Sequence, residues 1–200
     1  PGLLDSMQLG LAGIDAPRIV VVDNDSRDAS VEMALSHSSA PQVVGTGRNA
    51  GYAAAINAAA EVIATDADML ILNPDIRLLP GAAAILQAAL AEGSVGIAVP
   101  RILHPDGSLA LSLRREPSLS TVWSEALLGG RIATLAGTGE IIGDRALYRR
   151  NARVQWATGA ALLVAAHARR RIGAWDESFF LYSEVVDYMH HARACGFSIE

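Results

Sequence analysis

The chain has 200 residues, of which 51% are hydrophobic and 18% charged, so it can bury one sizeable core as a single globular domain. Its net charge of -5 disfavours nucleic-acid binding, which requires clustered Lys and Arg. The lone cysteine, Cys195, excludes an internal disulfide and a multi-cysteine metal site. No apolar run approaches the ~20 residues that span a bilayer. We therefore expect a cytoplasmic protein.

The first hundred residues alternate between helical and strand patterns. In chain order, the spacing of apolar residues predicts a helix over 3–11, a strand over 19–22, a helix over 28–36, a strand over 42–44, a helix over 53–65, a strand over 69–72, a helix over 80–91 and a strand over 95–99. This alternation is typical of βαβ units and predicts an α/β fold with a mainly parallel sheet.

The second hundred residues begin with turns and short segments, including 105–107 and 114–117. One apolar stripe at helical spacing stands out among them: Leu119, Val122, Trp123, Ala126 and Leu127. Such stripes usually face a core, so we predict a helix packed on the core. Contact with an acceptor or a membrane is the alternative.

Three apolar runs each end in polar, carboxylate-bearing residues. The runs are 19–22, followed by Asp23; 69–72, followed by Asn73 and Asp75; and 179–182, followed by Glu184 and Asp187. Because the carboxyl ends of parallel strands meet at one crevice, we expect these groups to converge. Acidic groups at such a place indicate a divalent cation and a phosphorylated ligand.

Six motifs in order give the chain a family resemblance. They are VDNDSRD (22–28), NAGY (49–52) with Asn57, LNPD (72–75), PR (100–101) with PDGS (105–108), WATGA (156–160) and GAWDESFFLY (173–182). Together they resemble the glycosyltransferase family 2 domain of the GT-A fold, particularly its rhamnosyltransferase-like members. The resemblance implies a three-layer GT-A sandwich over 1–200, with a nucleotide-binding half (1–100) and an acceptor-side half (101–200).

The resemblance implies an enzyme of bacterial cell-envelope polysaccharide synthesis. It would transfer a sugar, with rhamnose as a candidate, by inverting, metal-dependent displacement. The implied partners are a dTDP- or UDP-sugar donor and a glycan or polyprenyl-linked acceptor, with peripheral contact at the inner face of the plasma membrane. A sugar-phosphate nucleotidyltransferase is a third reading, but the glycine-rich, Arg/Lys-bearing loop that it needs after the first strand is missing.

The resemblance also implies the donor-binding residues. Asp23 would accept a hydrogen bond from the pyrimidine imide, although a turn or helix-cap aspartate is the alternative. Asn49 and Gly51 precede a helix whose free N–H groups can hold the diphosphate or the sugar. Asn57 would either orient this loop or serve only structural hydrogen bonding.

The segment Asn73-Pro74-Asp75 takes the place of the Asp-x-Asp motif of many GT-A enzymes. Asp75 would be the principal protein ligand of Mg²⁺ or Mn²⁺, with diphosphate oxygens and waters completing the shell. Asn73 replaces the first carboxylate with an amide. A plain turn is the alternative.

The family's general base is an aspartate in a Glu-Asp-x-Asp motif after the aromatic run. Here the motif reads Glu184-Val185-Val186-Asp187, so Val185 stands where the base is expected. Glu184 or Asp187 could substitute, although side chains leave a helix about 100° apart per residue. The alternative function is therefore a non-catalytic nucleotide-sugar-binding domain.

The acceptor side and the chain ends complete the expectations. The implied acceptor-side residues are Trp156, Gly159, Trp175, Asp176 and Glu177, with packing as the alternative role of the tryptophans. Relatives open with an apolar strand before the helix at 3–11 and continue past 200 with a strand and a histidine. We therefore expect a domain truncated at both ends, whose sheet lacks an inner strand.

Overall fold

The first half of the chain folds as predicted. The computed structural model describes residues 2–116 and 118–200. Its elements up to residue 98 are α1 (Gly2–Gly10), β1 (Val20–Asp23), α2 (Ser30–Leu35), β2 (Gln42–Gly45), α3 (Tyr52–Val62), β3 (Met69–Leu72), α4 (Ala82–Ala89) and β4 (Val95–Ala98). Every helix and strand predicted here forms, with ends within three residues of the expected ones.

The second half is less regular. Its elements are β5 (Leu113–Arg114), α5 (Leu119–Leu128), α6 (Gly130–Leu135), the 3-10 helix η1 (Leu147–Arg149), β6 (Trp156–Ala157), β7 (Ala161–Val164), α7 (Ala166–Ile172), α8 (Ser183–Ala194) and β8 (Ser198–Ile199). The apolar run 179–182 was expected to behave as a strand, and this is wrong: it is a loop with exposed Phe180, Leu181 and Tyr182. Pro117, at the end of the predicted turn 114–117, lies outside the described residues.

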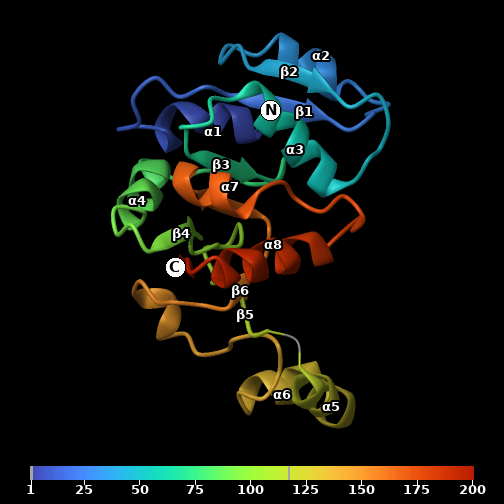
Figure 1. The fold of residues 1–200 in the computed structure, drawn as a ribbon, viewed down its shortest axis with the longest axis vertical. Helices are drawn as coiled ribbons and strands as arrows, with labels where there is room; N and C mark the ends of the chain where they lie inside the picture. Colours follow the sequence, from blue (N-terminus) through green and yellow to red (C-terminus); the bar gives the residue numbers. More distant parts are fainter. Residues whose placement is uncertain (1, 117) are drawn as a thin grey trace.

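The main sheet has the strand order β3-β7-β4-β8 (Figure 1). β7 runs antiparallel to both neighbours, pairing Leu70 with Leu163 and Ile97 with Val164, whereas β8 is parallel to β4. The α/β class is thus confirmed, but the sheet is mixed, because a strand of the second half lies between two strands of the first. The two predicted halves share one sheet.

The core lies between this sheet and α8. The buried face of α8 carries Val185, Tyr188, Met189 and Ala192, at the spacing that puts residues on one side of a helix. Trp175 stacks on Tyr188, with ring centroids 4.1 Å apart and planes 5° from parallel. This stack packs the segment that precedes the 179–182 loop against α8.

A gap separates the main sheet from a second sheet of two parallel strands, β1 and β2. Among the described residues, β1 pairs only with β2 and β3 only with β7. Between β1 and β3 lies a cavity of about 590 Å³, whose lining combines apolar side chains such as Val20 and Leu70 with charged ones such as Asp66 and Asp68. Among the described residues, no strand lies between β1 and β3.

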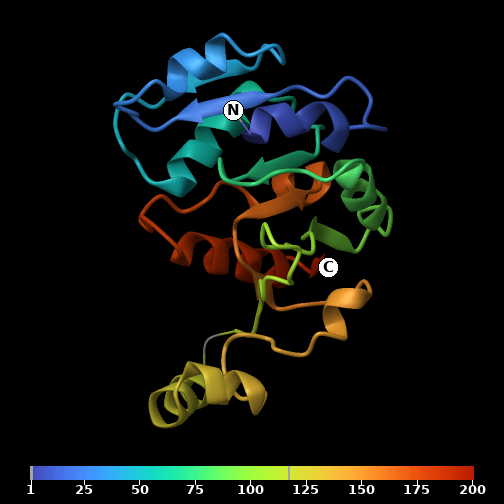
Figure 2. The ribbon, with the colours of Figure 1, turned by 180° about the vertical axis from the view of Figure 1, so that it is seen from behind.

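The α5–α6 hairpin, residues 119–135, lies at one end of the long axis, apart from both sheets (Figures 1 and 2). The short β5–β6 ladder connects it to the body. The helical spacing predicted for the apolar stripe is confirmed, but its burial against the core is wrong: Leu119, Val122, Trp123 and Leu127 are all exposed. Within the described part of the chain, no helix has the length and apolar character to cross a bilayer.

Candidate active site

A cleft of about 400 Å³ lies where β3, the β6–β7 connection and the start of α8 meet. We call it the β3 cleft. Its lining comprises Tyr52, Asn73, Arg114, Glu140, Trp156, Thr158, Gly159, Ala160, Leu181, Tyr182, Glu184 and Val185. A volume of this order suits a small ligand or part of a larger one. Four predicted site residues therefore meet in one cavity with Val185: Asn73, Trp156, Gly159 and Glu184.

Glu184 is the most unusual side chain of the cleft. It is only 2% exposed, and its Oε2 finds no hydrogen-bond partner among the described residues. As the second residue of α8, it lies where the free N–H groups of the helix favour negative charge. Burial, and secondarily the negative charge of Glu184, raise the pKa of the Tyr52 phenol. A carboxylate oxygen that is buried without a partner is rare in a folded protein and calls for a functional explanation.

Val185 faces the same cleft and contacts its floor. A Cβ added to Gly159 would lie 2.6 Å from Val185 Cγ2, so the glycine allows the valine to approach the β6–β7 connection. The Tyr52 hydroxyl donates to the Gly159 carbonyl oxygen at 2.6 Å and fixes this connection. Val185 is 4% exposed and carries no proton acceptor.

Asp187, the second predicted catalytic residue, is not part of the cleft lining. Its carboxylate lies 3.2 Å from His191 Nδ1, one turn further along α8. Of the two candidate bases, only Glu184 thus reaches the cleft. The cleft lies at the N-terminus of α8, so Glu184 and Val185 in the first turn both line it, whereas Asp187 does not.

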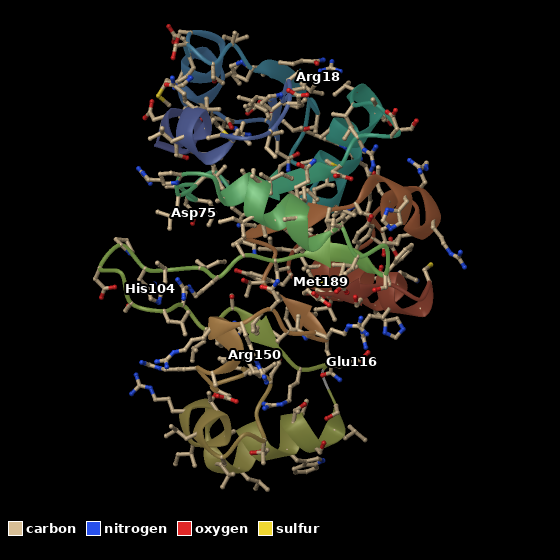
Figure 3. All side chains as sticks on the ribbon, turned by 90° about the vertical axis from the view of Figure 1, so that its left-hand side faces the viewer. Arg18, Asp75, His104, Glu116, Arg150 and Met189 are labelled. Carbon is tan, nitrogen blue, oxygen red and sulfur yellow. The ribbon has the colours of Figure 1, made fainter. Side chains whose placement is uncertain are left out.

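The two predicted site residues after β3 lie in different places: Asn73 lines the cleft, whereas Asp75 lies on the surface. The Asn73 backbone N–H donates to the Ala160 carbonyl oxygen at 2.9 Å, which fixes the turn beside β7 and places Asn73 in the cleft lining. Asp75 is exposed and lies at the outside of the molecule, on the same side as His104 (Figure 3). Among the described residues, no cluster of three His, Cys, Asp or Glu side chains forms a ready-made metal site.

Asp23 lies at the carboxyl end of β1, as predicted, but is also not part of the cleft lining. Its two carboxylate oxygens accept from the backbone N–H of Ser26 at 3.2 and 3.3 Å. The turn geometry that was the alternative to ligand binding is therefore present. One N–H donor leaves the carboxylate further acceptor capacity.

Asn24, a residue that sequence reasoning missed, organises the loop between β2 and α3. Its Oδ1 accepts from Thr46 Oγ1 at 3.0 Å and from the Ala50 N–H at 3.1 Å. Its Nδ2 donates to Asn49 Oδ1 at 3.3 Å and to the Gly51 carbonyl oxygen at 3.0 Å. Asn49 is thus held by the end of β1. The available signal was an amide side chain directly after a strand end.

Gly51 brings the loop at 179–182 close to the start of α3. Its φ is +88°, and an added Cβ would lie 2.9 Å from the Phe180 carbonyl oxygen. That oxygen is 3.5 Å from the Tyr52 backbone nitrogen, the first N–H of α3. Part of the helix N-terminus predicted to hold an anion is therefore occupied by the chain itself.

Asn57 clamps the turn that precedes the aromatic loop. Its Nδ2 donates to the Trp175 carbonyl oxygen and to Glu177 Oε1, both at 2.9 Å, and its Oδ1 accepts from the Trp175 N–H at 3.0 Å. These three residues line a different cavity, also of about 400 Å³. Asn57 therefore makes structural hydrogen bonds to the turn at Trp175–Glu177, which was one of its two predicted roles.

The predicted acceptor-side residues do not gather at one place. Trp156 and Gly159 line the β3 cleft, and the Trp156 indole N–H donates to the Arg115 carbonyl oxygen at 2.7 Å. Trp175 and Glu177 belong to the second cavity. Asp176 is exposed, and hydrogen bonds from Ser178 lower its pKa.

A polar contact ties α8 to the segment after β5. Glu116 Oε1 lies 3.0 Å from Arg193 Nη2 and 3.0 Å from His190 Nδ1. Hydrogen bonds from Arg193 and then from His190 lower the pKa of the Glu116 carboxyl. The two adjacent histidines, His190 and His191, thus take separate carboxylate partners.

Comparison with known proteins assigns the family. Residues 8–156 match the family model described as glycosyl transferase family 2. The chain belongs to glycosyl transferase family 2. The matched residues of this family 2 domain run from α1 to β6, so α8, with Glu184 and Val185, lies beyond them.

Two kinds of relative extend the comparison. The domain is 32% identical over 190 residues to N-acetylglucosaminyl-diphospho-decaprenol L-rhamnosyltransferase of Mycobacterium tuberculosis, in the strains CDC 1551 / Oshkosh and ATCC 25618 / H37Rv. The match covers 90% of this chain and 62% of the relative's length. A crystal structure of GalNAc-T7 with UDP, GalNAc and Mn²⁺ superposes with a TM-score of 0.62 at 14% identity, over 91% of this chain and 35% of that one. This likeness confirms the GT-A fold of the family 2 domain.

Proposed function

We propose that this family 2 domain binds a nucleotide-diphosphate sugar at the β3 cleft and transfers the sugar to a hydroxyl of a glycan or lipid-linked acceptor. The observation that carries the proposal is the buried, unpartnered Glu184 oxygen in a cleft that Asn73 also lines. The activity named for the mycobacterial relative supports rhamnose as the sugar and a diphospho-polyprenol-linked acceptor. A pyrimidine donor, dTDP- or UDP-linked, is recognised through Asp23 at the end of β1.

In this proposal Glu184 acts as the general base. The acceptor hydroxyl gives its proton to the Glu184 carboxylate while its oxygen forms a bond to the anomeric carbon. The bond from that carbon to the diphosphate oxygen breaks on the opposite face, so the configuration inverts and the nucleoside diphosphate leaves.

Asp75 provides the protein side of a cation site. Neither a hydrogen bond nor an ion pair within residues 2–116 and 118–200 involves its carboxylate, so the group is open to Mg²⁺ or Mn²⁺. A single carboxylate suffices where substrate phosphate oxygens and waters complete the shell. When bound, such a cation supplies charge neutralisation for the departing diphosphate.

A non-catalytic, donor-binding domain is the second candidate function. The observation in its favour is Val185, which faces the cleft at the position of the family's base and cannot take a proton. Loss of a general base removes about 10²–10⁴-fold in rate. In this case Glu184 would bind the donor or the acceptor without driving transfer.

Donor binding is tested first, by thermal shift with dTDP-, UDP- and GDP-sugars, each with and without Mn²⁺. Selective binding to the folded state raises the melting temperature. We expect a shift with a pyrimidine donor that depends on Mn²⁺ and is lost in Asp75→Asn. Asp66→Asn, an exposed carboxylate before the amino end of β3, is the matched control and should keep the shift. No shift with any of these sugars would contradict both candidate functions.

Transfer is tested next, with the parent and Val185→Asp side by side. Aspartate has nearly the shape of valine, so it fits against Gly159 without a new clash. Transfer by the parent supports the leading proposal. A parent that binds the donor but transfers only after Val185→Asp supports the non-catalytic domain.

A further inference from the structure

The loop 179–182 exposes large side chains next to the β3 cleft. Phe180 is 60% exposed, Leu181 52% and Tyr182 78%. Leu181 and Tyr182 are part of the cleft lining, whereas Phe180 is not. Within the part of the chain that the structure describes, neither a hydrogen bond nor a ring contact holds the Tyr182 side chain. An aromatic ring therefore stands at the mouth of the cleft without a partner in the protein.

The backbone at Tyr182 has a conformation that a tyrosine disfavours. Its φ is +76° and its ψ is −47°, which is close to the γ-turn that is rare and strained. The other non-glycine residues with a positive φ in the described ranges are two alanines and an aspartate. A glycine would adopt this backbone without the steric cost of a side chain. Position 182 therefore carries a tyrosine against the local preference of the chain.

Tyr182 is also the N-cap residue of α8. This position favours Ser, Thr, Asp or Asn, because their side-chain oxygens accept from the first free N–H groups of the helix. The Tyr182 side chain makes no such hydrogen bond. Strained backbone that the rest of the protein does not use is concentrated at functional sites. The benefit of the tyrosine is therefore expected from a bound ligand.

The neighbours of Tyr182 in the cleft indicate the chemistry of that ligand. The buried carboxylate of Glu184 follows two residues later, and the Trp156 ring lines the same cavity. A sugar ring suits both kinds of group: its hydroxyls donate to a carboxylate, and the C–H groups on one side of the ring pack against the electron-rich face of an aromatic side chain. A lipid chain would not use the carboxylate, and a diphosphate would be repelled by its charge.

We propose that Tyr182 is a substrate-binding residue, whose ring stacks on the pyranose ring of the acceptor and so presents an acceptor hydroxyl to Glu184. This inference rests on the proposed function, because it names a further contact in the same cleft. The acceptor sugar is the occupant since it must meet Glu184, while the rest of the glycan or lipid-linked acceptor leaves through the open mouth where Tyr182 is exposed. A glycine at position 182 would relieve the strain but lose the ring.

The test measures the dissociation constants of methyl glucopyranoside and its 2-acetamido analogue for the full chain, by NMR titration with and without UDP and Mn²⁺. Tyr182→Ala should raise both constants at least about tenfold, because the stacking and the apolar area of the ring are lost together. Tyr182→Phe should stay within about twofold of the parent, because it keeps the aromatic face. Phe180→Ala is the matched control: it removes an exposed aromatic ring of the same loop that does not line the cleft, and should bind like the parent.

Stability gives a second readout. Tyr182→Gly should weaken pyranoside binding like Tyr182→Ala, yet raise the melting temperature by about 2 °C or more, because the strain is lost with the side chain. A Tyr182→Gly variant that is no more stable than the parent would contradict the strained backbone and count against the proposal.

Failure of this inference and failure of the proposed function give different results. A parent that shows the donor-induced thermal shift, but binds the pyranosides equally well after Tyr182→Ala, overturns the inference and leaves the proposed function standing. A parent that shows the shift but binds neither pyranoside does the same. A parent with neither a donor-induced shift nor pyranoside binding overturns both.

Discussion

Replacing Glu184 should separate activity from stability. The carboxylate is 2% exposed and has one oxygen without a partner, which is an unfavourable state for a charged group in a folded protein. Nothing in the packing of α8 requires the charge, since its buried neighbours Val185 and Tyr188 are held by apolar contacts. A residue of this kind is retained for function at the expense of stability.

The magnitude follows from the unpaired oxygen. Leaving a buried polar group unsatisfied costs about 1–3 kcal/mol, and more when the group is charged. Glu184→Met fills the same space with an apolar side chain, so the free energy of unfolding should rise by about 1–3 kcal/mol. For a chain of this length that corresponds to an increase in melting temperature of about 2–12 °C. Glu184→Gln removes only the charge and should give a smaller increase.

The assay pairs calorimetry with sugar transfer. If Glu184 is the base, both variants should lower transfer about 10²–10⁴-fold. Donor-induced thermal shifts should survive in Glu184→Gln, because the amide keeps the shape of the carboxylate. Full transfer activity in Glu184→Gln would refute its role as base. A large drop in the stability of Glu184→Met would refute the claim that the oxygen is unpaired.

Three further predictions concern neighbouring contacts. Gly159→Ala should lower the unfolding free energy by about 1–3 kcal/mol, because its Cβ would lie 2.6 Å from Val185 Cγ2. Adding Val185→Ala to this variant should relieve the clash. If the stability losses of the two single variants simply add in the double variant, the clash is contradicted. Asn57→Ala should cost about 2–3 kcal/mol in urea unfolding through three lost hydrogen bonds, without changing activity of the remaining folded protein. Glu116→Gln should destabilise by less than about 1 kcal/mol near neutral pH, since this partly exposed pair is solvent-screened. Because the folded pKa of Glu116 is lowered, its contribution is present above the unfolded pKa and should vanish as the pH falls through the folded value, which unfolding curves at several pH values would show.

The sequence predicted local structure better than the relation between distant segments. Runs such as 69–72 and 53–65 carry their own period, and both formed an element at the expected place. The position of β7 between β3 and β4 depends on pairing across about ninety residues, which no local pattern encodes. The aromatic run 179–182 resembled a strand, but its side chains project from a loop that closes on Gly51.

The same distinction holds for the candidate site. Motif order identified Asn73, Gly159 and Glu184, and the structure brings all three to one cleft. Helical spacing predicted that Glu184 would point away from the cleft that Val185 faces. This prediction is wrong, because the cleft lies at the N-terminus of α8 and not along one side of the helix. The apolar stripe of α5 shows a second limit of prediction from sequence. Its period defined the helix but could not tell which side the rest of the protein would cover.

The gap between β1 and β3 has a consequence for how a nucleotide would act on the protein. Since no backbone ladder crosses the gap within residues 2–116 and 118–200, the β1–β2 ribbon meets the main sheet there through side chains and through the chain segments that connect them. A two-stranded ribbon has little stability of its own, so amide protons in β1 and β2 should exchange with solvent sooner than those in β3 and β7. A ligand that reaches from Asp23 to Asn73 would bridge the two bodies and slow that exchange, which makes the nucleotide a structural brace as well as a reactant.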